Sequence, residues 1–553
     1  MTQSPLTALA ALVLVAAYLA VMLALGRRRT HHLDAEGFVV ADRDVPLLSG
    51  TASMGATWIW AASVFAAATA AYTYGPSGAF HYAFWGGLAL LFVWRYGRRV
   101  RQLAPHGHTL SEFVRARHGR LSQGVIALEG YLNSQYSLVV NFTAAGALLS
   151  LLSPVSYQVA VIVVAVGVVA YTSLSGIRAS ITTDLVQMGA IALLAVVLVP
   201  LALAGAGGPG PVEAGLDRLG ERGQWVSMEA FLGQGAPMMA LVLAYAFANP
   251  TVWQRVWTVR ASQLRAIYVR SGLLYIAVVF SLGTLGLLAL ATGVEPVDGD
   301  LNTLIPAVIG AYLPGWLAAT VMLLILAAVT STADSDLSAL SSMAVADLWH
   351  GHVDAHASPG RLLAVGRVSM VVVAAIGAAV ALLRIDILTL VLFYGMIRAA
   401  SVFPIAASIA WQRVSNAGFA AGVVGGIGAG SAARVVAGAG GDAAGAAPGS
   451  LLLGVALVLV AAVGAGTMAG CVAFPFARPR GALWLGVAVA GAIAVLHTVW
   501  LPGLLAYPVL LSTLVALGAG MLVCVGVSLA GSHRFEWDEL AGHVHPLTAA
   551  KVR

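Results

Sequence analysis

The sequence predicts an all-α polytopic membrane protein, and two properties of the chain predict it. Hydrophobic residues make up 60% of the 553 residues and charged residues only 9%, whereas soluble domains carry roughly 25% charged residues. Apolar runs of about 20 residues, the length of a membrane-spanning helix, follow one another along the chain. The bilayer therefore fixes the layout, and the chain divides into groups of spans rather than globular domains.

The distribution of charge argues against a nucleic-acid partner, although the net charge is +6. The arginines recur in alternate short loops, as in the cytoplasmic loops of membrane proteins. Those placed in cytoplasmic loops include Arg178, Arg255, Arg260, Arg265, Arg361 and Arg413. No arginine falls in the predicted outer loops 76–78, 151–155, 294–312 and 501–505. Only the outer loop 205–235 breaks the rule, with Arg218 and Arg222. We expect a multi-pass cell-membrane protein, plasma or inner, with its N-terminus outside and its C-terminus in the cytoplasm.

Two of the predicted spans are interrupted at mid-membrane. The second span contains Gly50, Gly55 and the polar-aromatic run 56–60. The seventh contains AFANPT at 246–251, where Pro250 removes a backbone donor and frees a carbonyl. Interrupted helices at the start of two five-helix halves are typical of a secondary transporter's binding site. The alternative is a pair of ordinary kinks, because glycine and proline are frequent in membrane helices.

About 15 spans then fall into six segments, and the odd number of spans in each half makes the two repeats inverted. The segments are a leading transmembrane helix with a cytoplasmic linker (1–44), the first repeat (45–204), an extracytoplasmic loop (205–235), the second repeat (236–411), about four trailing helices (412–530) and a cytoplasmic tail (531–553).

The stretch 323–350, LLILAAVTSTADSDLSALSSMAVADLWH, begins as an apolar run and then gathers hydroxyls and carboxylates. Ser331, Thr332 and Ser335 supply oxygens, and two of the three share a helix face. Asp334 lies inside the hydrophobic segment, where an ionisable group is costly and usually functional. Oxygen ligands without Cys or His favour a hard cation. The alternative is that the hydroxyls only bond to the preceding turn or join neighbouring helices.

Asp184 opens the sixth predicted span and allows two interpretations. Its carboxylate either interacts with the dipole at the start of a helix or joins Asp334 and Ser335 around a cation. Asp334 is also a candidate proton carrier, because buried carboxylates in membrane helices often serve in proton relays.

Five stretches resemble the sodium:solute symporter family, and the resemblance covers nearly the whole chain. They are 57–87, 175–187, 249–265, 326–349 and 403–422. The TDxxQ element of SGIRASITTDLVQ and the run STADS are the most specific. The resemblance implies a LeuT-type 5+5 inverted repeat with one leading and about four trailing helices, and uptake driven by sodium. Stretch 57–87 and the run VWQR are most similar to the urea active transporter branch.

The resemblance also implies a shared sodium (Na+) site made of backbone carbonyls and hydroxyls. The matching positions are the carbonyls of Ala56, Ile59 and Ala328 and the hydroxyls of Ser331 and Thr332. Some members hold a second ion, and the residues that match there are Asp184, Asp334 and Ser335. Because the family often has a hydroxyl where this chain has Asp334, a second sodium and a proton both remain open at this site.

The solute is expected near the two interruptions, at mid-membrane. Amide and hydroxyl partners with aromatic walls suit a small polar solute such as urea. The candidates of this kind are Trp58, Trp60, Ser63, Tyr245, Asn249 and Trp253. Asn249 stands where the urea branch tends to carry an acid, so another amide or amine is open. Arg398 keeps a proton- or sodium-coupled organic-acid or amino-acid symporter open.

The expected partners are therefore the small solute, the sodium ion and membrane lipid, with no nucleic acid and no obligate protein partner. No enzyme activity is expected, because no nucleophile, base and orienting group fall together in the sequence.

Overall fold

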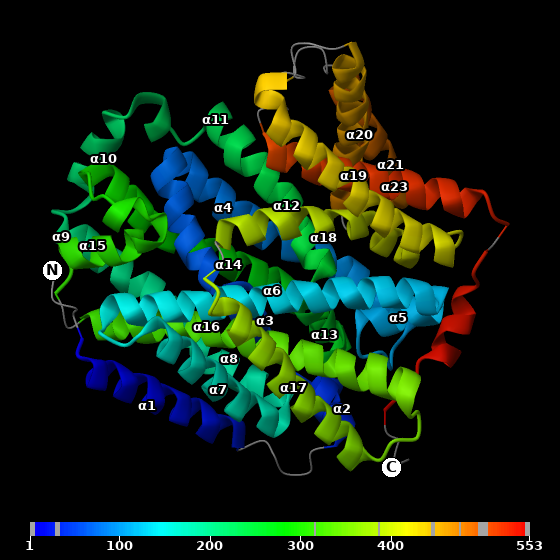
Figure 1. Cartoon of the computed structure of the whole chain (residues 1–553), viewed down its shortest axis with the longest axis horizontal. Coiled ribbons are helices and arrows are strands. Elements are labelled where there is room, and N and C mark those ends of the chain that lie inside the picture. Colours follow the sequence, from blue (N-terminus) through cyan, green and yellow to red (C-terminus); the bar gives the residue numbers. More distant parts are fainter. Residues whose placement is uncertain are drawn as a thin grey trace.

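The computed structural model describes residues 6–27, 34–314, 317–384, 387–443, 448–474, 477–495, 507–532 and 534–547. In these residues the regular structure is helical apart from one isolated bridge between Val45 and Val259. Most of the long helices run side by side in a similar direction (Figure 1). This is the all-α architecture that the composition predicts.

The first half of the chain contains α1 (Ala8–Arg27), α2 (Ala35–Val40), α3 (Leu47–Trp58), α4 (Ala61–Leu103), α5 (Leu110–His118), α6 (Arg120–Leu152), α7 (Tyr157–Ser175), α8 (Ile177–Leu193), α9 (Val199–Gly205), α10 (Pro209–Asp217), α11 (Met228–Ala230), α12 (Ala236–Ala248) and α13 (Pro250–Thr258). The second half contains α14 (Leu264–Thr292), α15 (Leu304–Tyr312), α16 (Leu317–Ser342), α17 (Pro359–Ala381), α18 (Ile387–Ala410), α19 (Asn416–Ala443), α20 (Pro448–Ala473), α21 (Pro479–Val495) and α23 (Pro508–Leu529). Single π turns join α8 to α9 (η2, Leu194–Leu198) and α11 to α12 (η4, Phe231–Gly235), and a longer one, η8 (Met343–Val353), extends α16. Short 3-10 turns are η1 (Ala41–Arg43), η3 (Gly220–Gly223), η5 (Ala261–Gln263), η6 (Val297–Gly299), η7 (Leu301–Thr303) and η9 (Trp537–His543).

Within the described residues, 11 helices are long and apolar enough to cross a membrane, or 12 with the bent pair α3–α4. The lower count than the predicted number of about 15 spans has two sources. The element α4 contains most of the predicted spans 45–75 and 79–97, but its backbone leaves the helical conformation at Gly75 (φ 65°, ψ −154°), so two helices meet there, beside the predicted loop 76–78. The predicted spans 386–411 and 482–500 correspond to α18 and α21, whose described apolar parts are shorter. The predicted outer loop 501–505 lies outside the described residues.

The bend of α4 at Gly75 explains one arginine that breaks the charge rule. Gly75 has φ 65°, and a Cβ there would collide with the carbonyl of Arg222. The guanidinium of Arg222 donates to the carbonyls of Thr73 (2.9 Å) and Tyr72 (2.7 Å). The loop arginine therefore satisfies carbonyls that the bend releases from the helix.

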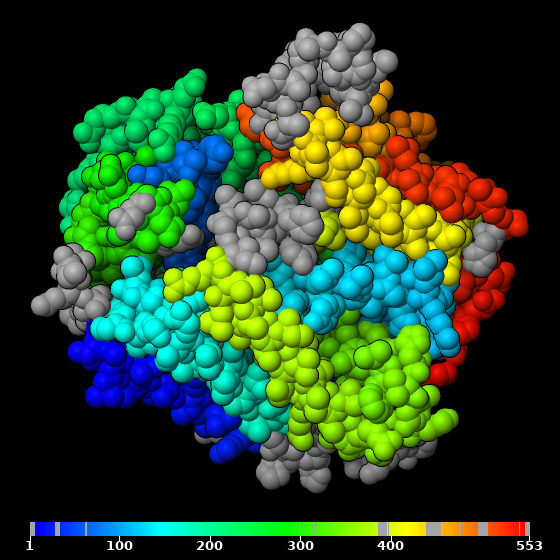
Figure 2. Space-filling view, viewed as in Figure 1, coloured from blue at the N-terminus to red at the C-terminus, as the bar shows by residue number. Residues whose placement is uncertain are grey.

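Large apolar side chains cover the outward faces of the peripheral helices. On α7, Val159, Ile162 and Val166 are exposed at helical spacing. On α17, Val368 and Val371 are exposed in the same way, and this helix lies yellow-green on the face shown in Figure 2. Apolar side chains outside and polar side chains inside are the arrangement of helices surrounded by lipid.

Both predicted interruptions are real breaks. α3 ends at Trp58, and Ile59 (ψ 71°) and Trp60 (ψ 169°) leave the helical conformation before α4 begins. The helices on the two sides of this break are bent by 56°. α12 ends before Asn249 (ψ 114°), and Pro250 begins α13, where a missing backbone donor costs nothing. The alternative of ordinary kinks is therefore wrong for both helices.

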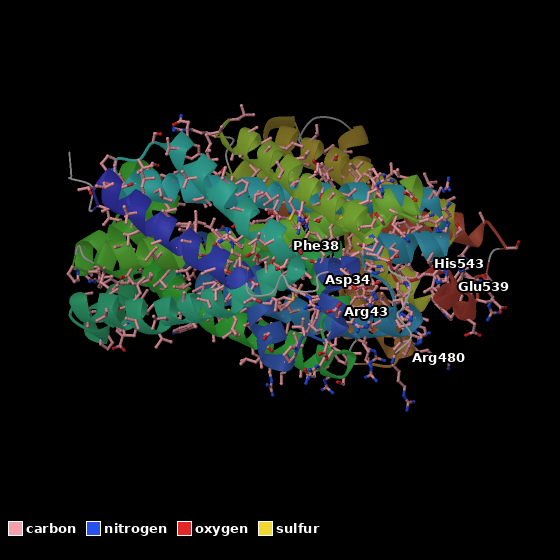
Figure 3. The ribbon with its side chains drawn as sticks, turned by 90° about the horizontal axis from the view of Figure 1, so that it is seen from below. Asp34, Phe38, Arg43, Arg480, Glu539 and His543 are labelled. Atoms are coloured by element: carbon pink, nitrogen blue, oxygen red, sulfur yellow. The ribbon has the colours of Figure 1, made fainter. Side chains whose placement is uncertain are left out.

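The described end of the chain folds back to the side where the predicted cytoplasmic loops lie. Figure 3 shows Arg480, Glu539 and His543 on the same side of the molecule as Arg43. The backbone N–H of Leu547 donates to Glu36 on α2 (2.8 Å). The tail thus lies with the arginine-bearing loops, as predicted, while the membrane side on which they lie stays a prediction.

A buried ionic cluster ties α2 to the segment before α5. The ring of His108 is fully buried, 3.0 Å from Glu36 and 3.0 Å from Glu112, and Arg43 is 3.1 Å from Glu36. Burial opposes the charged imidazole, but Glu112 and Glu36 outweigh it and raise the pKa of His108 to about 9. Burial also opposes ionisation of Glu36, but His108 and Arg43 outweigh it and lower the pKa of Glu36 to about 2.

We expect the effect of His108→Gln on thermal unfolding to depend on pH. The folded pKa of His108 lies above the ordinary 6.5, so its stabilisation is complete below about pH 6.5 and is lost as the pH rises through about 9. The variant should lose about 3 kcal/mol of unfolding free energy near pH 6 and little near pH 10. His356→Gln, in an exposed loop, is the control. An equal loss at both pH values would contradict the assignment.

Candidate functional site

The end of α3 meets the middle of α16 through Thr332. Its hydroxyl lies 3.2 Å from the carbonyl of Thr57 and 3.3 Å from that of Ala328. The chain leaves the helix after Trp58. In the last turn of α3 the carbonyl of Gly55 still accepts from the Ile59 N–H, but the carbonyls after Gly55 lose their helical donors. The hydroxyl of Ser331, the preceding residue, is buried without a hydrogen-bond partner among the described residues. Carbonyl and hydroxyl oxygens are the ligands of a hard cation, so this donor set fits sodium.

All five residues predicted for the sodium site are buried, each at most 1% exposed: Ala56, Ile59, Ala328, Ser331 and Thr332. The contact with α16 runs through the carbonyl of Thr57, which the sequence analysis missed because a backbone carbonyl leaves no signal in residue type. No group of three His, Cys, Asp or Glu side chains suited to a metal occurs in the described part of the chain. A metal ion at this break would therefore depend on neutral oxygens.

Three consecutive residues of α16 point in different directions, because successive helix positions are about 100° apart. Asp334 accepts hydrogen bonds from Tyr171 on α7 (2.8 Å) and Ser180 on α8 (2.6 Å). Ser335 faces the end of α3 and also contacts Ser180 (3.1 Å). Asp336 faces α6 and α12. The polar run of the sequence thus distributes its groups around one helix.

Arg255 occupies the place where the predicted second ion site would lie. It is on α13 and 1% exposed, so its predicted place in a cytoplasmic loop is wrong. Its Nη2 donates to Thr57 Oγ1 (2.7 Å), Ser335 Oγ (2.8 Å) and Asp184 Oδ2 (3.3 Å). The physical reason is that α13 starts at the break, deep in the bundle, which leaves Arg255 too far inside to reach a loop. A fixed guanidinium charge lies between Asp184 and Ser335, two of the three residues predicted for a second ion.

Asp184 is fully buried and is not at a helix start. α8 begins at Ile177, so Asp184 lies about two turns inside, which rules out the helix-dipole interpretation. Its Oδ2 accepts hydrogen bonds from Ser53 (2.6 Å) and Arg255. The carboxylate is therefore part of a buried ion pair.

Aromatic side chains gather at the first break and form what we call the aromatic cluster: Trp58, Trp60, Tyr136 and Tyr245. The Tyr245 ring lies 5.7 Å from that of Trp60 and 5.1 Å from that of Trp58. Tyr136 on α6, which the sequence analysis missed, lies 6.1 Å from Trp60. The guanidinium of Arg398 lies 4.6 Å from the Tyr245 ring centre. Three of the predicted solute-binding residues are thus brought together.

The other three predicted solute-binding residues have partners of their own. Asn249 caps α13 by accepting from the backbone N–H of Thr251 (2.8 Å). Ser63 bonds to Tyr275 on α14 (3.1 Å). Trp253 is fully buried and donates to the carbonyl of Phe247 (2.6 Å). These contacts account for their positions structurally, and a role in solute binding stays a prediction for each.

The sequence analysis also missed buried polar groups beside the aromatic cluster. Neither carboxylate oxygen of Asp336 has a hydrogen-bond partner among the described residues, and the same holds for the side chains of Asn133 and Ser134 on α6. All three residues are at most 1% exposed. Ser137 faces both Asp336 and the hydroxyl of Tyr245. The polar triplet 133–135 inside a long span was the available signal.

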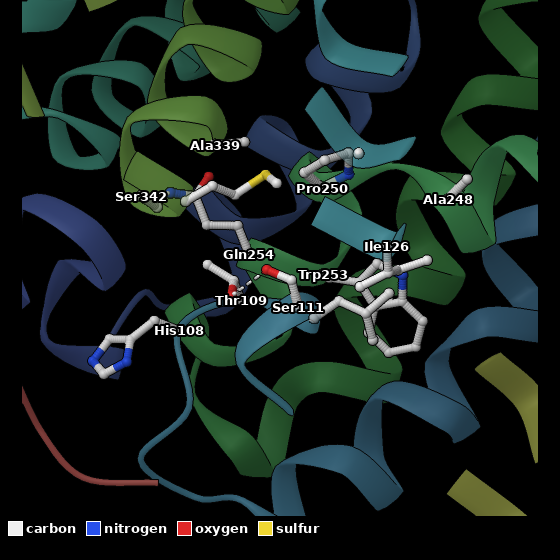
Figure 4. Close-up of a pocket in the computed structure, with 13 residues that line it drawn as sticks. His108, Thr109, Ser111, Ile126, Ala248, Pro250, Trp253, Gln254, Ala339 and Ser342 are labelled. Carbon is white, nitrogen blue, oxygen red and sulfur yellow. Dashed lines mark hydrogen bonds between the residues drawn. The ribbon is translucent and has the colours of Figure 1, made fainter. Parts of the chain in front are cut away.

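A narrow pocket lies beside the second break, on the side of the predicted cytoplasmic loops (Figure 4). It is lined by α13, α16 and the segment before α5, with Trp253, Gln254 and Thr109 among its residues. Its volume of about 20 Å³ is room for about one water molecule. Thr109 and Ser111 both donate to Asp347 on η8. The structure therefore leaves no open passage for a solute through this pocket.

Two broken helices that meet at a polar centre define the LeuT-type class of membrane transporter folds. A solved Na+-coupled sialic acid symporter in a substrate-bound outward-open state matches with a TM-score of 0.64, over 89% of this chain and 97% of that chain. The 16% identity of the two sequences makes this a likeness of fold alone. The model of the sodium:solute symporter family matches residues 38–426, and the chain belongs to this family.

The similar curated proteins are transporters. The probable urea active transporter 1 of Schizosaccharomyces pombe is 26% identical over 366 residues, 61% of this chain and 55% of that protein. The urea-proton symporter DUR3 of Oryza sativa subsp. japonica is 26% identical over 437 residues, 71% and 59% of the two chains. The high-affinity choline transporter 1 of Caenorhabditis elegans is 24% identical over 371 residues, 63% and 62%. The chain thus spans somewhat over half the length of these relatives. The expected family is confirmed, and the expected resemblance to urea active transporters is confirmed by these relatives.

We expect Arg255→Gln to lower the unfolding free energy by about 3 kcal/mol, because Asp184 is left as a buried charge without its counter-ion. The double variant Arg255→Gln with Asp184→Asn should recover most of the loss. Thermal unfolding in detergent measures both.

The matched control is Arg260→Gln, which breaks an exposed pair with Asp44 (2.7 Å, side chains 45% and 71% exposed) and should leave the unfolding free energy almost unchanged, because solvent screens exposed ion pairs. Similar losses for Arg255→Gln and Arg260→Gln would contradict the buried pair.

Proposed function

We propose that this protein is a sodium-coupled symporter that imports a small polar solute, urea or a related amide or amine, by alternating access. The observation that carries the proposal is the approach of the Thr332 hydroxyl to the carbonyl of Thr57 at the broken end of α3. The similarity to urea active transporters supports the solute, and the family supports the ion.

Sodium would couple to the fold by joining two helices. An ion held by Ala56, Ile59, Ala328, Ser331 and Thr332 binds tightly only when α3 and α16 lie together. A ligand shifts a conformational equilibrium only through its different affinities for the two states. Sodium would thus favour the state in which these helices are joined and the pocket beside the second break is narrow.

We further propose that one sodium ion, rather than two, accompanies the solute. Arg255 already supplies a positive charge between Asp184 and Ser335. A second cation placed there would meet the guanidinium at close range, which is unfavourable in a low-dielectric interior.

A proton-coupled symporter is the second candidate, because one relative is named a urea-proton symporter. Asp334, buried among hydroxyls of α7 and α8, is the residue on which such coupling would depend. Counter-flow of labelled urea, proline, acetate and putrescine in proteoliposomes, with and without sodium, separates the candidates. Uptake without sodium that follows a pH gradient selects the proton.

We expect Thr332→Ala to raise the sodium concentration for half-maximal uptake by about 10-fold or more, because one oxygen ligand is lost. Sodium titration of labelled urea uptake in proteoliposomes is the measurement. Thr467→Ala, which removes a hydroxyl bonded to Val463 on α20 (2.8 Å) and Met521 on α23 (2.8 Å), is the control. Unchanged uptake and sodium dependence in Thr332→Ala would refute the proposed ion site.

A further inference from the structure

We propose that Asp336 is a solute-binding carboxylate that receives N–H groups of the transported solute. The site would then take N–H-rich solutes, namely ureas, amidines and guanidines, and reject carboxylic acids. The inference rests on the proposed function and assigns the solute class to the same central site.

Asp336 differs from every other acidic group around α16. Asp334 accepts hydrogen bonds from Tyr171, Ser180 and Thr183. Asp347, further along the same helical run, accepts from two hydroxyls. Asp184 has a hydroxyl and the guanidinium of Arg255. Asp336 is 1% exposed, and the hydroxyls of Ser137 and Ser134 approach its carboxylate, but no donor among the described residues lies in hydrogen-bonding geometry to it. An unsatisfied buried carboxylate is costly, and such a group in a functional protein calls for an explanation.

The position of Asp336 on α16 suits a role in binding the solute, and this role would explain its unsatisfied carboxylate. It is on the side of α16 that faces α6 and α12, where Ser137 adjoins both its carboxylate and the hydroxyl of Tyr245. Tyr245 belongs to the aromatic cluster, in which its ring stacks on Trp60. Asn133 and Ser134, also without partners among the described residues, lie on the same helix as Ser137. A polar solute between the rings and α16 would meet these unsatisfied groups together.

The charged side chains around the aromatic cluster determine which charge a bound solute can carry. Arg398 lies against the rings of Tyr245 and Tyr136, with Glu129 near enough to interact with its charge. Arg255 donates to Asp184 and to Ser335. Its charge also acts on Asp336 without a hydrogen bond to it. Among the described residues no cation is bonded to the carboxylate of Asp336, which lies on the side of α16 near Tyr245 of the aromatic cluster. A solute carboxylate would meet a like charge, whereas the two N–H groups of an amidinium or guanidinium match a carboxylate in a bidentate pair.

Competition against labelled urea uptake in proteoliposomes with the full chain tests the inference. The competitors are guanidinium, acetamidine, acetamide and acetate. We expect guanidinium and acetamidine to compete best and acetate not at all. In Asp336→Asn the inhibition constants of the two cations should rise about 10- to 100-fold, the loss expected for a hydrogen bond to a charged group. The control is Asp354→Asn, which alters an aspartate carboxylate that lies 3.4 Å from the Arg361 guanidinium, outside the proposed site. This variant should leave the inhibition constants unchanged.

The outcomes separate the inference from the proposed function. If the wild-type protein does not move urea in the counter-flow assay, the proposed function is wrong. If it moves urea but Asp336→Asn leaves the order of competitors unchanged, or acetate competes as well as guanidinium, the inference is overturned alone. If Asp336→Asn does not fold, Asp336→Glu decides: a changed ratio of guanidinium to urea affinity supports the inference, and an unchanged ratio overturns it.

Discussion

The requirement that backbone polar groups find partners inside a membrane governs the whole structure. In hydrocarbon an unpaired N–H or C=O is costly, so a helix breaks only where protein groups replace the lost hydrogen bonds. At the first break the hydroxyl of Thr332 meets a released carbonyl, and at the second Asn249 caps the new helix start. At the bend of α4, Arg222 serves the same purpose. The irregular backbone therefore depends on the polar side chains that satisfy it. The same break that interrupts α3 also frees backbone carbonyl oxygens that can bind a cation.

Buried charge is arranged by the same logic around α16. Asp184 and Arg255 form a pair at 3.3 Å, and Asp334 is surrounded by hydroxyls. Removing one member of such a set leaves an uncompensated charge. The guanidinium therefore acts as a permanent structural cation, whereas an ion at Thr332 would face only neutral oxygens. A neutral site binds and releases an ion with less electrostatic change than a carboxylate cage, which suits an ion that must leave in each cycle.

The sequence predicted those features that residue type alone reveals. Glycine and proline marked both breaks, and the hydroxyl run 331–335 marked the helix that meets the first one. The position of Arg255 was missed, because the charge rule assigns an arginine near a span end to a loop and carries no information on how deep α13 begins. The carbonyl of Thr57 was missed because every residue type has one. Asp336 was missed because a lack of partners is a property of the packed structure: Asp334 and Asp336 look alike in sequence and differ only in which neighbours their helix faces present.

Arg255, the proposed sodium site and the proposed solute site all contact α16. This shared helix is a physical basis for coupling the movement of ion and solute. Arg255 ties α13 to α3, α8 and α16 through Thr57, Asp184 and Ser335. The proposed sodium would tie α3 to α16, and a solute at Asp336 would tie α16 to α6 and α12. Sodium and solute would then each stabilise the packing of α16 against its neighbours. Since a conformational equilibrium responds to the differential affinity of each ligand for its states, two ligands that favour the same docked position of α16 favour each other. Coupling of ion and solute would thus require no direct contact between them.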